Sequence, residues 1–132
     1  MTVTATKLAP FNGDILARAK DNRYFREVVS TGPHAQVVVM CIPPKGSIGS
    51  EVHPKVDQVL VFVRGEGVAV LEGIRTPVSP GRLVHVPAGM RHDFVNEGSV
   101  DLQLYTVYAP PQHAPGTIHR TRAEADADDE HA

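Results

Sequence analysis

Seven short apolar runs, separated by glycine and proline, constrain the fold of this chain more than any other feature. Runs of this length and spacing predict strands rather than helices, and the regular turn punctuation is typical of an all-β sandwich or barrel. Several runs are apolar at nearly every position, which indicates strands covered on both faces. The runs are FREVVS (25–30), AQVVVMCIP (35–43), DQVLVFVRG (57–65), GVAVLEG (67–73), RLVHVPAG (82–89), HDFVNEG (92–98) and VDLQLYTVYAP (100–110).

The turns between these runs predict how the strands are connected. Glycine, proline and asparagine in short segments favour tight reversals of the chain. We therefore expect the turns at 64–67, 80–81 and 96–99 to close β-hairpins.

The two ends of the chain carry different signals. Residues 14–20 (DILARAK) predict a short helix. Residues 109–117 contain three prolines and are expected to leave the barrel as an extended arm. Thr121 and Glu124 have the spacing of a helix-capping box, but the following residues are alanines and acids without an apolar face. The tail is therefore expected to be a frayed helix or disordered, and to contribute little to stability.

Length and composition indicate one domain. With 132 residues the chain is long enough for one hydrophobic core. We expect an N-terminal arm (1–24), an antiparallel β-barrel (25–110), and a Pro-rich arm with an acidic tail (111–132). Net charge is −2, and five acidic residues fall after residue 119. This balance argues against a surface for nucleic acid or anionic membranes.

The single cysteine and the absence of long apolar segments predict a cytoplasmic protein. Cys41 lies within the apolar run QVVVMCI, so a buried, inert thiol is expected and an internal disulfide is excluded. No stretch of the sequence approaches the ~18–20 apolar residues of a membrane span, and the N-terminus lacks the apolar core of a signal peptide.

The segment EVHPKVDQ, residues 51–58, concentrates potential ligand atoms directly before an apolar strand. Side chains two residues apart on a strand point to the same face, so Glu51 and His53 are expected to project together. Asp57 and Gln58 begin the next strand and must point in opposite directions. The segment thus predicts a cluster of oxygen and nitrogen donors at the edge of the core.

A second segment, GRLVHVPAGMRHDFVN, carries a spacing that resembles the second motif of the cupin superfamily, G(X)5PXG(X)2H(X)3N. Every fixed position matches, with Gly81, Pro87, Gly89, His92 and Asn96 in order. The resemblance spans roughly residues 35–110 and implies a jelly-roll β-barrel.

The first cupin motif, G(X)5HXH(X)3,4E(X)6G, is present in altered form. Counting back from Gly65, Gln58 stands in the place of the glutamate and His53 in that of the second histidine. Glu51 takes the place of the first histidine, and Gly46 is one position too close to it. The sequence also resembles a subgroup of small one-domain cupins that are often labelled by analogy to mannose-6-phosphate isomerase.

The resemblance implies one divalent metal ion, bound by Glu51, His53, Gln58 and His92. Imidazole and carboxylate ligands suit Fe, Ni, Mn, Co or Zn. Asp57 is the alternative to Gln58 as an oxygen ligand. Strand parity and the spacing to Gly65 favour Gln58.

The implied function is that of a metal-dependent enzyme, a dioxygenase or an isomerase/epimerase, acting on a small oxygen-rich metabolite. Glu51 would then also serve as a general base. A non-catalytic barrel that binds or senses a small molecule is the alternative, and a metal-free structural barrel is a third. The resemblance further implies a homodimer, for which residues 24–31 are a candidate exchanged strand.

Several other residues are assigned from the sequence. Arg26 or Arg91 are candidates for contact with an anionic substrate. His34 is expected to be solvated and His85 to be packed or on the surface. His113 and His119 on the Pro-rich arm are expected outside the site, with metal or substrate contact as the alternative. Candidates for the substrate pocket are Leu60, Phe62, Arg91, Phe94, Tyr105 and Tyr108.

Overall fold

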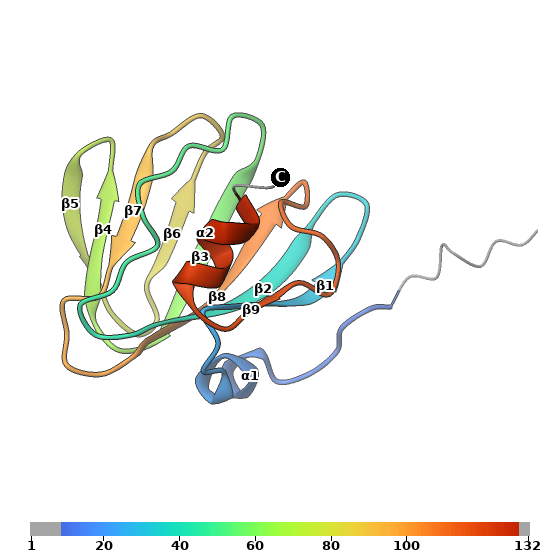
Figure 1. Ribbon diagram of the computed structural model, residues 1–132, viewed down its shortest axis with the longest axis horizontal. Helices are drawn as coiled ribbons and strands as arrows, with labels where there is room; N and C mark the ends of the chain where they lie inside the picture. The colour runs from blue at the N-terminus through green and yellow to red at the C-terminus, as the bar shows by residue number, and fades with distance from the viewer. Residues whose placement is uncertain (1–8, 130–132) are drawn as a thin grey trace, which may run out of the picture.

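The computed structural model describes residues 9–129, which form two antiparallel sheets and two short helices (Figure 1). The six-stranded sheet has the order β6 (Leu83–Val86), β3 (Asp57–Arg64), β8 (Leu102–Ala109), β2 (Gln36–Ile42), β1 (Arg26–Thr31) and β9 (Ile118–His119). The three-stranded sheet has the order β5 (Ile74–Val78), β4 (Gly67–Leu71) and β7 (His92–Val95). The fold is a jelly roll, as predicted, although hydrogen bonds between described strands do not close the two sheets into a continuous barrel.

All seven predicted strands are present, and the structure adds two that the sequence did not indicate. β5 contains Pro77, which removes a backbone donor, and the strand lies at the exposed edge of its sheet where that loss is tolerated. β9 has only two residues and pairs with Arg26 and Glu27 of β1. β1, the candidate exchanged strand, therefore already has neighbours on both sides within its own chain.

The predicted hairpins at 64–67, 80–81 and 96–99 are wrong. Each of these turns carries the chain from one sheet to the other, between β3 and β4, β5 and β6, and β7 and β8. Gly65 has a φ of 87°, and a Cβ at this position would collide with the carbonyl of Asp101. The sequence correctly predicts that the chain turns at these positions, but a corner between two sheets uses the same residue types as a hairpin.

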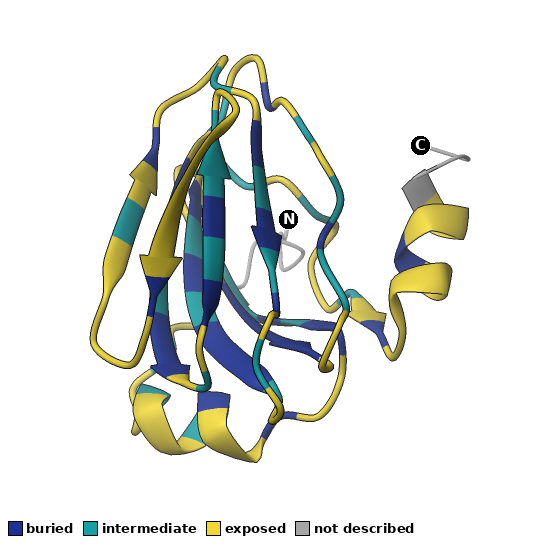
Figure 2. Cartoon of the chain, turned by 90° about the vertical axis from the view of Figure 1, so that its left-hand side faces the viewer, coloured by how far each residue is buried: buried dark blue, intermediate teal, exposed yellow. Residues whose placement is uncertain are grey.

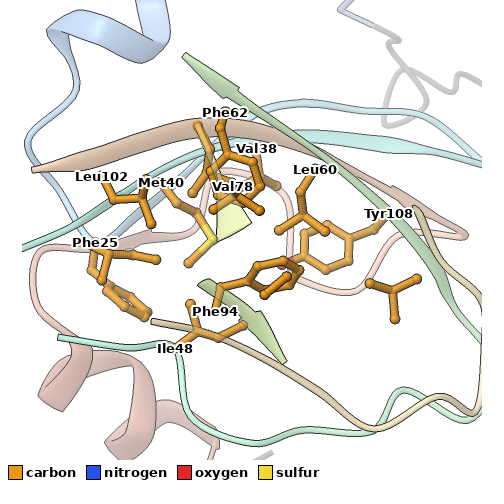
Figure 3. Packing of buried hydrophobic residues seen from close by; sticks show 14 of the residues in the cluster. Phe25, Val38, Met40, Ile48, Leu60, Phe62, Val78, Phe94, Leu102 and Tyr108 are labelled. Atoms are coloured by element: carbon orange, nitrogen blue, oxygen red, sulfur yellow. The ribbon is translucent and has the colours of Figure 1, made fainter. Parts of the chain in front are cut away.

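The hydrophobic core lies between the two sheets and contains residues from both (Figure 3). Alternate positions of β3 and β8 face this core, including Leu60, Phe62 and Leu104. Its larger members are Phe25, Met40, Ile42, Leu60, Phe62, Phe94, Leu102, Leu104 and Tyr108. Side chains at the other positions of β3 and β8 point to the outer face of the six-stranded sheet.

Helix α1 (Ile15–Asp21) confirms the predicted N-terminal helix and covers the outer face of the six-stranded sheet. Ala19 packs there in a second apolar cluster with Val39 and Val63. The Asp14 side chain caps the helix by accepting a hydrogen bond from the backbone of Ala17 at 3.1 Å. Among the described residues, neither helix has the length and apolarity needed to cross a membrane.

The C-terminal arm does not leave the fold but returns along the six-stranded sheet. Gln36 on β2 holds it in place, because the Gln36 amide donates to the carbonyl of His113 at 2.7 Å and accepts from the backbone N–H of His113 at 3.0 Å. β9 then pairs with β1. The expectation of an arm that extends away from the barrel is wrong.

The acidic tail forms helix α2 (Arg122–Asp129), which docks onto the jelly roll. Figure 2 shows that α2 is mostly exposed, and among residues 122–128 the buried position is Ala125, which is 2% exposed and belongs to the core cluster. Arg122 donates to the Ser47 hydroxyl at 3.0 Å. A single alanine is too weak a sequence signal to predict docking, and the expectation that the tail is dispensable does not fit these contacts.

We therefore predict that Ala125→Asp lowers the melting temperature by several degrees, because the substitution buries an unpaired charge. Ala123→Asp on the exposed side of the same helix is the matched control and should leave the melting temperature nearly unchanged. Thermal unfolding followed by circular dichroism measures both. Equal melting temperatures for the two variants would mean that α2 does not dock in solution.

Candidate metal centre

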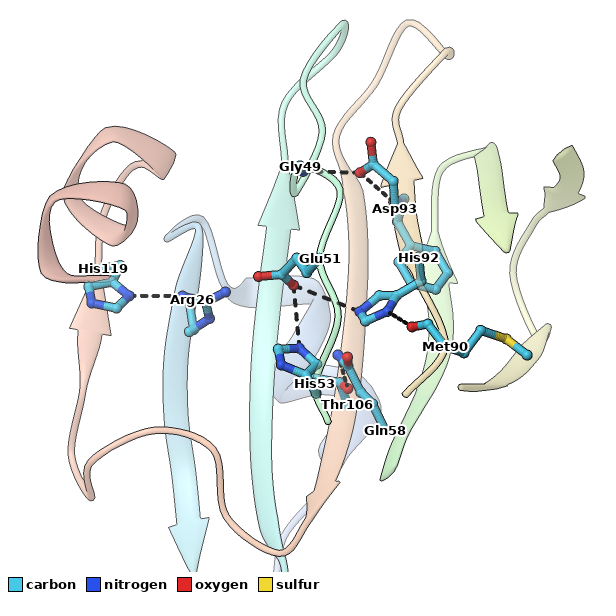
Figure 4. A network of polar contacts seen from close by, with 11 residues as sticks. Arg26, Gly49, Glu51, His53, Gln58, Met90, His92, Asp93, Thr106 and His119 are labelled. Carbon is cyan, nitrogen blue, oxygen red and sulfur yellow. Dashed lines mark hydrogen bonds and ion pairs between the residues drawn. The ribbon is translucent and has the colours of Figure 1, made fainter. Parts of the chain in front are cut away.

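Glu51 and His53, which are two residues apart, converge with His92 from a distant part of the chain (Figure 4). The backbones of Glu51 and His92 form an isolated bridge with two hydrogen bonds of 2.9 Å. The Glu51 Oε1 atom lies 3.5 Å from His53 Nε2 and 3.8 Å from His92 Nε2. The three donor atoms all lie within 4.8 Å of one another.

In both histidines the Nε2 atom is turned toward Glu51. His92 Nδ1 lies 3.0 Å from the carbonyl of Met90, so Nδ1 carries the proton and the lone pair of Nε2 points toward Glu51. The Nε2 atoms of His53 and His92 are buried and have no hydrogen-bond partner. Buried polar atoms are rarely left in this state unless a ligand, ion or water completes them.

The Glu51 carboxylate is held in its ionised form. Burial by itself raises its pKa, but the contact with His53 and the nearby positive charges together outweigh that effect, so the pKa is lowered overall. Among these charges the permanent one is that of the Arg26 guanidinium. The side chain remains 27% exposed, so this carboxylate is the member of the trio that solvent reaches most easily.

This trio is positioned to bind a divalent metal ion. Two donor atoms at the usual ~2.0–2.2 Å from one ion lie about 3.0–3.5 Å apart, depending on the coordination angle. The observed separations of 3.5 Å and 3.8 Å need only a small inward movement of the side chains. Two imidazoles and one carboxylate form a donor set suited to Fe, Ni, Mn, Co or Zn.

Strand parity at the start of β3 places Gln58 inside and Asp57 outside, as predicted. Gln58 is 1% exposed, and its Nε2 donates to the Thr106 hydroxyl at 3.0 Å. Since that hydroxyl itself donates to the carbonyl of Val59 at 2.8 Å, the amide orientation is fixed and Gln58 Oε1 remains buried without a partner. Asp57 is exposed and accepts the backbone N–H of Ala88 at 2.8 Å. The alternative in which Asp57 faces the site is wrong.

Only some of the predicted pocket residues lie near the two histidines. The Tyr108 ring is 6.1 Å from that of His53, and the Phe94 ring is 6.1 Å from that of His92, between centroids. Phe62 lies behind Phe94, at 5.7 Å. Leu60 packs in the same core cluster.

Tyr105 and Arg91 do not join this group. Tyr105 has the opposite parity on β8 and packs with Val39 beneath α1. Arg91 is exposed, and its guanidinium lies 3.3 Å from the Ser50 hydroxyl. Both face away from the donor cluster because their strand neighbours Thr106 and His92 face toward it.

Arg26 of β1, a predicted contact for an anionic substrate, lies against two histidines of the C-terminal arm. His119 is 5% exposed, and its Nδ1 lies 3.1 Å from Nη1 of Arg26. The His113 ring packs 5.0 Å from the Tyr108 ring. Burial, followed by the charge of Arg26, lowers the pKa of His113 to about 3. Neither histidine belongs to the trio of Glu51, His53 and His92, and the pairing of β9 with β1 brings both to the same side of the fold as Arg26.

The remaining candidates behave as expected. Cys41 is buried, and burial together with the nearby Asp101 charge raises its thiol pKa to about 12, which makes it inert. His34 and His85 are exposed.

Comparison with known proteins identifies relatives of this chain. A family model described as "Cupin domain" matches residues 38–108. The uncharacterized protein YrkC of Bacillus subtilis is 38% identical over 122 residues, which cover 88% of this chain and 66% of that protein. The chain therefore spans just under two thirds of this curated relative.

Solved structures agree with the fold. The crystal structure of BH2720 from Bacillus halodurans has a TM-score of 0.88 and 38% identity, and the match covers 90% of this chain and 95% of that chain. A predicted oxalate decarboxylase from Thermotoga maritima has a TM-score of 0.57 and 25% identity, with 60% of this chain and 69% of that chain covered.

We predict that the purified protein binds one divalent ion per chain and that His92→Ala abolishes this binding, since it removes one of two imidazole donors. His85→Ala, which changes an exposed histidine on β6, is the control and should retain the ion. Elemental analysis of the two variants and the unchanged protein measures the stoichiometry. Retention of the ion by His92→Ala would contradict the assignment.

Proposed function

This chain belongs to the cupin family, and from that premise we propose that it is a metal-dependent enzyme acting on a small oxygen-rich metabolite. One observation carries the proposal. Three buried atoms around Glu51 have no hydrogen-bond partner, and they are the atoms that would ligate an ion: His53 Nε2, His92 Nε2 and Gln58 Oε1. A purely structural core would not leave three such atoms unsatisfied at one place.

Gln58 is the proposed fourth ligand, through its side-chain oxygen. Its amide is held by Thr106, so the free oxygen cannot rotate away without losing a buried hydrogen bond. A neutral amide is a weaker ligand than the glutamate of the usual cupin motif. Glu51, in the place of a histidine, restores the negative charge.

The metal would supply Lewis acidity or, as Fe(II), redox chemistry to the bound metabolite. The chain's own residues have separate roles in the proposal. Glu51 holds the ion and, through its exposed side, accepts a proton from the metabolite. Phe94 and Tyr108 flank the histidines and exclude water from their inner side.

Two reaction classes fit this arrangement, a dioxygenase and an isomerase or epimerase of the kind that the mannose-6-phosphate isomerase-like label suggests. The similarity to a predicted oxalate decarboxylase supports chemistry on a small oxygen-rich compound. A cytoplasmic homodimer, expected from the single cysteine and the family resemblance, belongs to the same proposal.

Oxygen uptake and solvent exchange separate these classes. The Fe(II)-loaded protein is mixed with a panel of small hydroxy acids, keto acids and sugars, and oxygen consumption is followed. The same panel is then incubated in deuterium oxide without oxygen. Uptake of oxygen identifies a dioxygenase, and incorporation of deuterium identifies an isomerase. Tight binding of a compound without either reaction would favour the binding or sensing alternative.

The fourth ligand is tested by substitutions at Gln58. Gln58→Glu should tighten metal binding, because a charged oxygen replaces a neutral one at nearly the same reach, and should change activity because the ion becomes a poorer Lewis acid. Gln58→Leu should weaken binding without unfolding the domain. Titration with Fe(II), Ni(II) and Zn(II) measures the affinities.

Asp57→Asn is the control for these variants, since the exposed Asp57 carboxylate contacts Ala88 instead of the site. Its metal affinity should equal that of the unchanged protein. Unaltered binding in Gln58→Leu together with loss of binding in Asp57→Asn would exclude Gln58 as a ligand in favour of Asp57.

A further inference from the structure

A continuous row of rings extends the donor cluster toward the C-terminal arm. Adjacent ring centroids lie 5.1 Å apart between His92 and His53, 6.1 Å between His53 and Tyr108, 5.0 Å between Tyr108 and His113, and 6.5 Å between His113 and His119. The row therefore connects the proposed metal ligands to two histidines of the arm. These histidines are not among the ligands proposed for the ion.

Arg26 stands at the far end of this row and is a buried cation. It is 5% exposed, and no carboxylate of residues 9–129 lies within 4.0 Å of its guanidinium. Its Nη1 contacts His119, but its Nε is buried without a partner. Figure 4 shows Arg26 between His119 and Glu51. A buried guanidinium with a free N–H lacks the anion that would offset the cost of its burial.

His113 adds a second unsatisfied nitrogen atom on the same side. Its Nε2 is buried and has no partner. Its backbone is fixed by two hydrogen bonds to the Gln36 side chain, so the ring is held against Tyr108 by the fold of the arm. Arg26 and His113 thus leave two buried nitrogen atoms free beside the proposed metal centre.

We infer that Arg26 and His113 form an oxyanion-binding subsite for a carboxylate of the metabolite, whose other oxygen atoms face Glu51, His53 and His92. This inference rests on the proposed function and narrows its substrate class to small acids with a second carboxylate away from the reacting end. Guanidinium geometry matches a carboxylate through paired N–H donors, and an imidazole N–H supplies one more. A neutral sugar would leave the charge of Arg26 unpaired.

His119 and α2 position this subsite. His119 contacts Arg26 through Nδ1, and its Nε2 lies 2.9 Å from the Asp128 carboxylate on α2. The carboxylate accepts from Nε2, so Nδ1 is left as the acceptor for the Arg26 N–H. Helix α2 thereby orients the Arg26 guanidinium through His119.

The test compares two α-hydroxy acids that carry the same α-hydroxycarboxylate group, through which each would bind the metal. Malate carries a second carboxylate and lactate does not. The Ni(II)-loaded protein is titrated with each by calorimetry, and malate is expected to bind at least ~10-fold more tightly, as a desolvated charge-assisted pair provides. Arg26→Gln should bring the two affinities to within a factor of about two, with lactate affinity and nickel content unchanged.

His113→Leu is the second variant, because His113 is only partly buried and should tolerate substitution better than the buried Arg26. It should lower malate affinity several-fold and leave lactate affinity unchanged. Arg91→Gln alters an exposed arginine next to His92 in the sequence and is the matched control, which should keep the full preference for malate. Equal binding of the two acids by the unchanged protein, or a malate preference that survives both Arg26→Gln and His113→Leu, would overturn the inference.

Nickel content, measured on each sample first, separates this result from a failure of the proposed function. If no ion binds, the metal-free protein is titrated with malate alone. Malate binding that Arg26→Gln abolishes would then support the subsite without the metal, and absence of binding would overturn it.

Discussion

Two backbone hydrogen bonds between Glu51 and His92 are the interaction on which the rest of the site depends. They join a segment before β3 to the first residue of β7, so that two donor side chains from distant sequence positions meet. His53 follows by strand parity, and Gln58 reaches the same space from the opposite sheet. The site is therefore a property of how the sheets pack, and neither motif forms it alone.

The same packing leaves an unusual number of polar atoms inside the fold. Each buried donor or acceptor without a partner costs roughly 1–3 kcal/mol in the free energy of unfolding. Five such atoms lie in the donor cluster or along the row of rings that extends it to Arg26. They belong to Arg26, His53, Gln58, His92 and His113. The hydrophobic core around Phe62 and Phe94 must offset this cost. An ion and an anionic ligand would satisfy these atoms in complementary ways, since the first needs lone pairs and the second needs N–H donors.

The sequence predicted what depends on local pattern and short spacing. Alternation along β3 was enough to place Gln58 inside and Asp57 outside, and the motif spacing identified His53 and His92. Tyr105 was misplaced because a strand that is apolar on both faces does not show which face meets the site. The sequence predicted a hairpin at Gly65, where the structure has a corner between the two sheets, because a hairpin turn and such a corner need the same backbone conformation.

The C-terminal arm and tail show where local reasoning ends. Three prolines and a run of acids resemble an extended linker, yet the arm is held by the side chain of Gln36 and the tail by Ala125 and Asp128. These partners are distant in sequence or carry little hydrophobic signal. Because Asp128 contacts His119 and His119 contacts Arg26, α2 is joined to the guanidinium through one histidine. A ligand whose binding needs the guanidinium in this orientation would therefore favour the docked helix, by the reciprocity of linked binding.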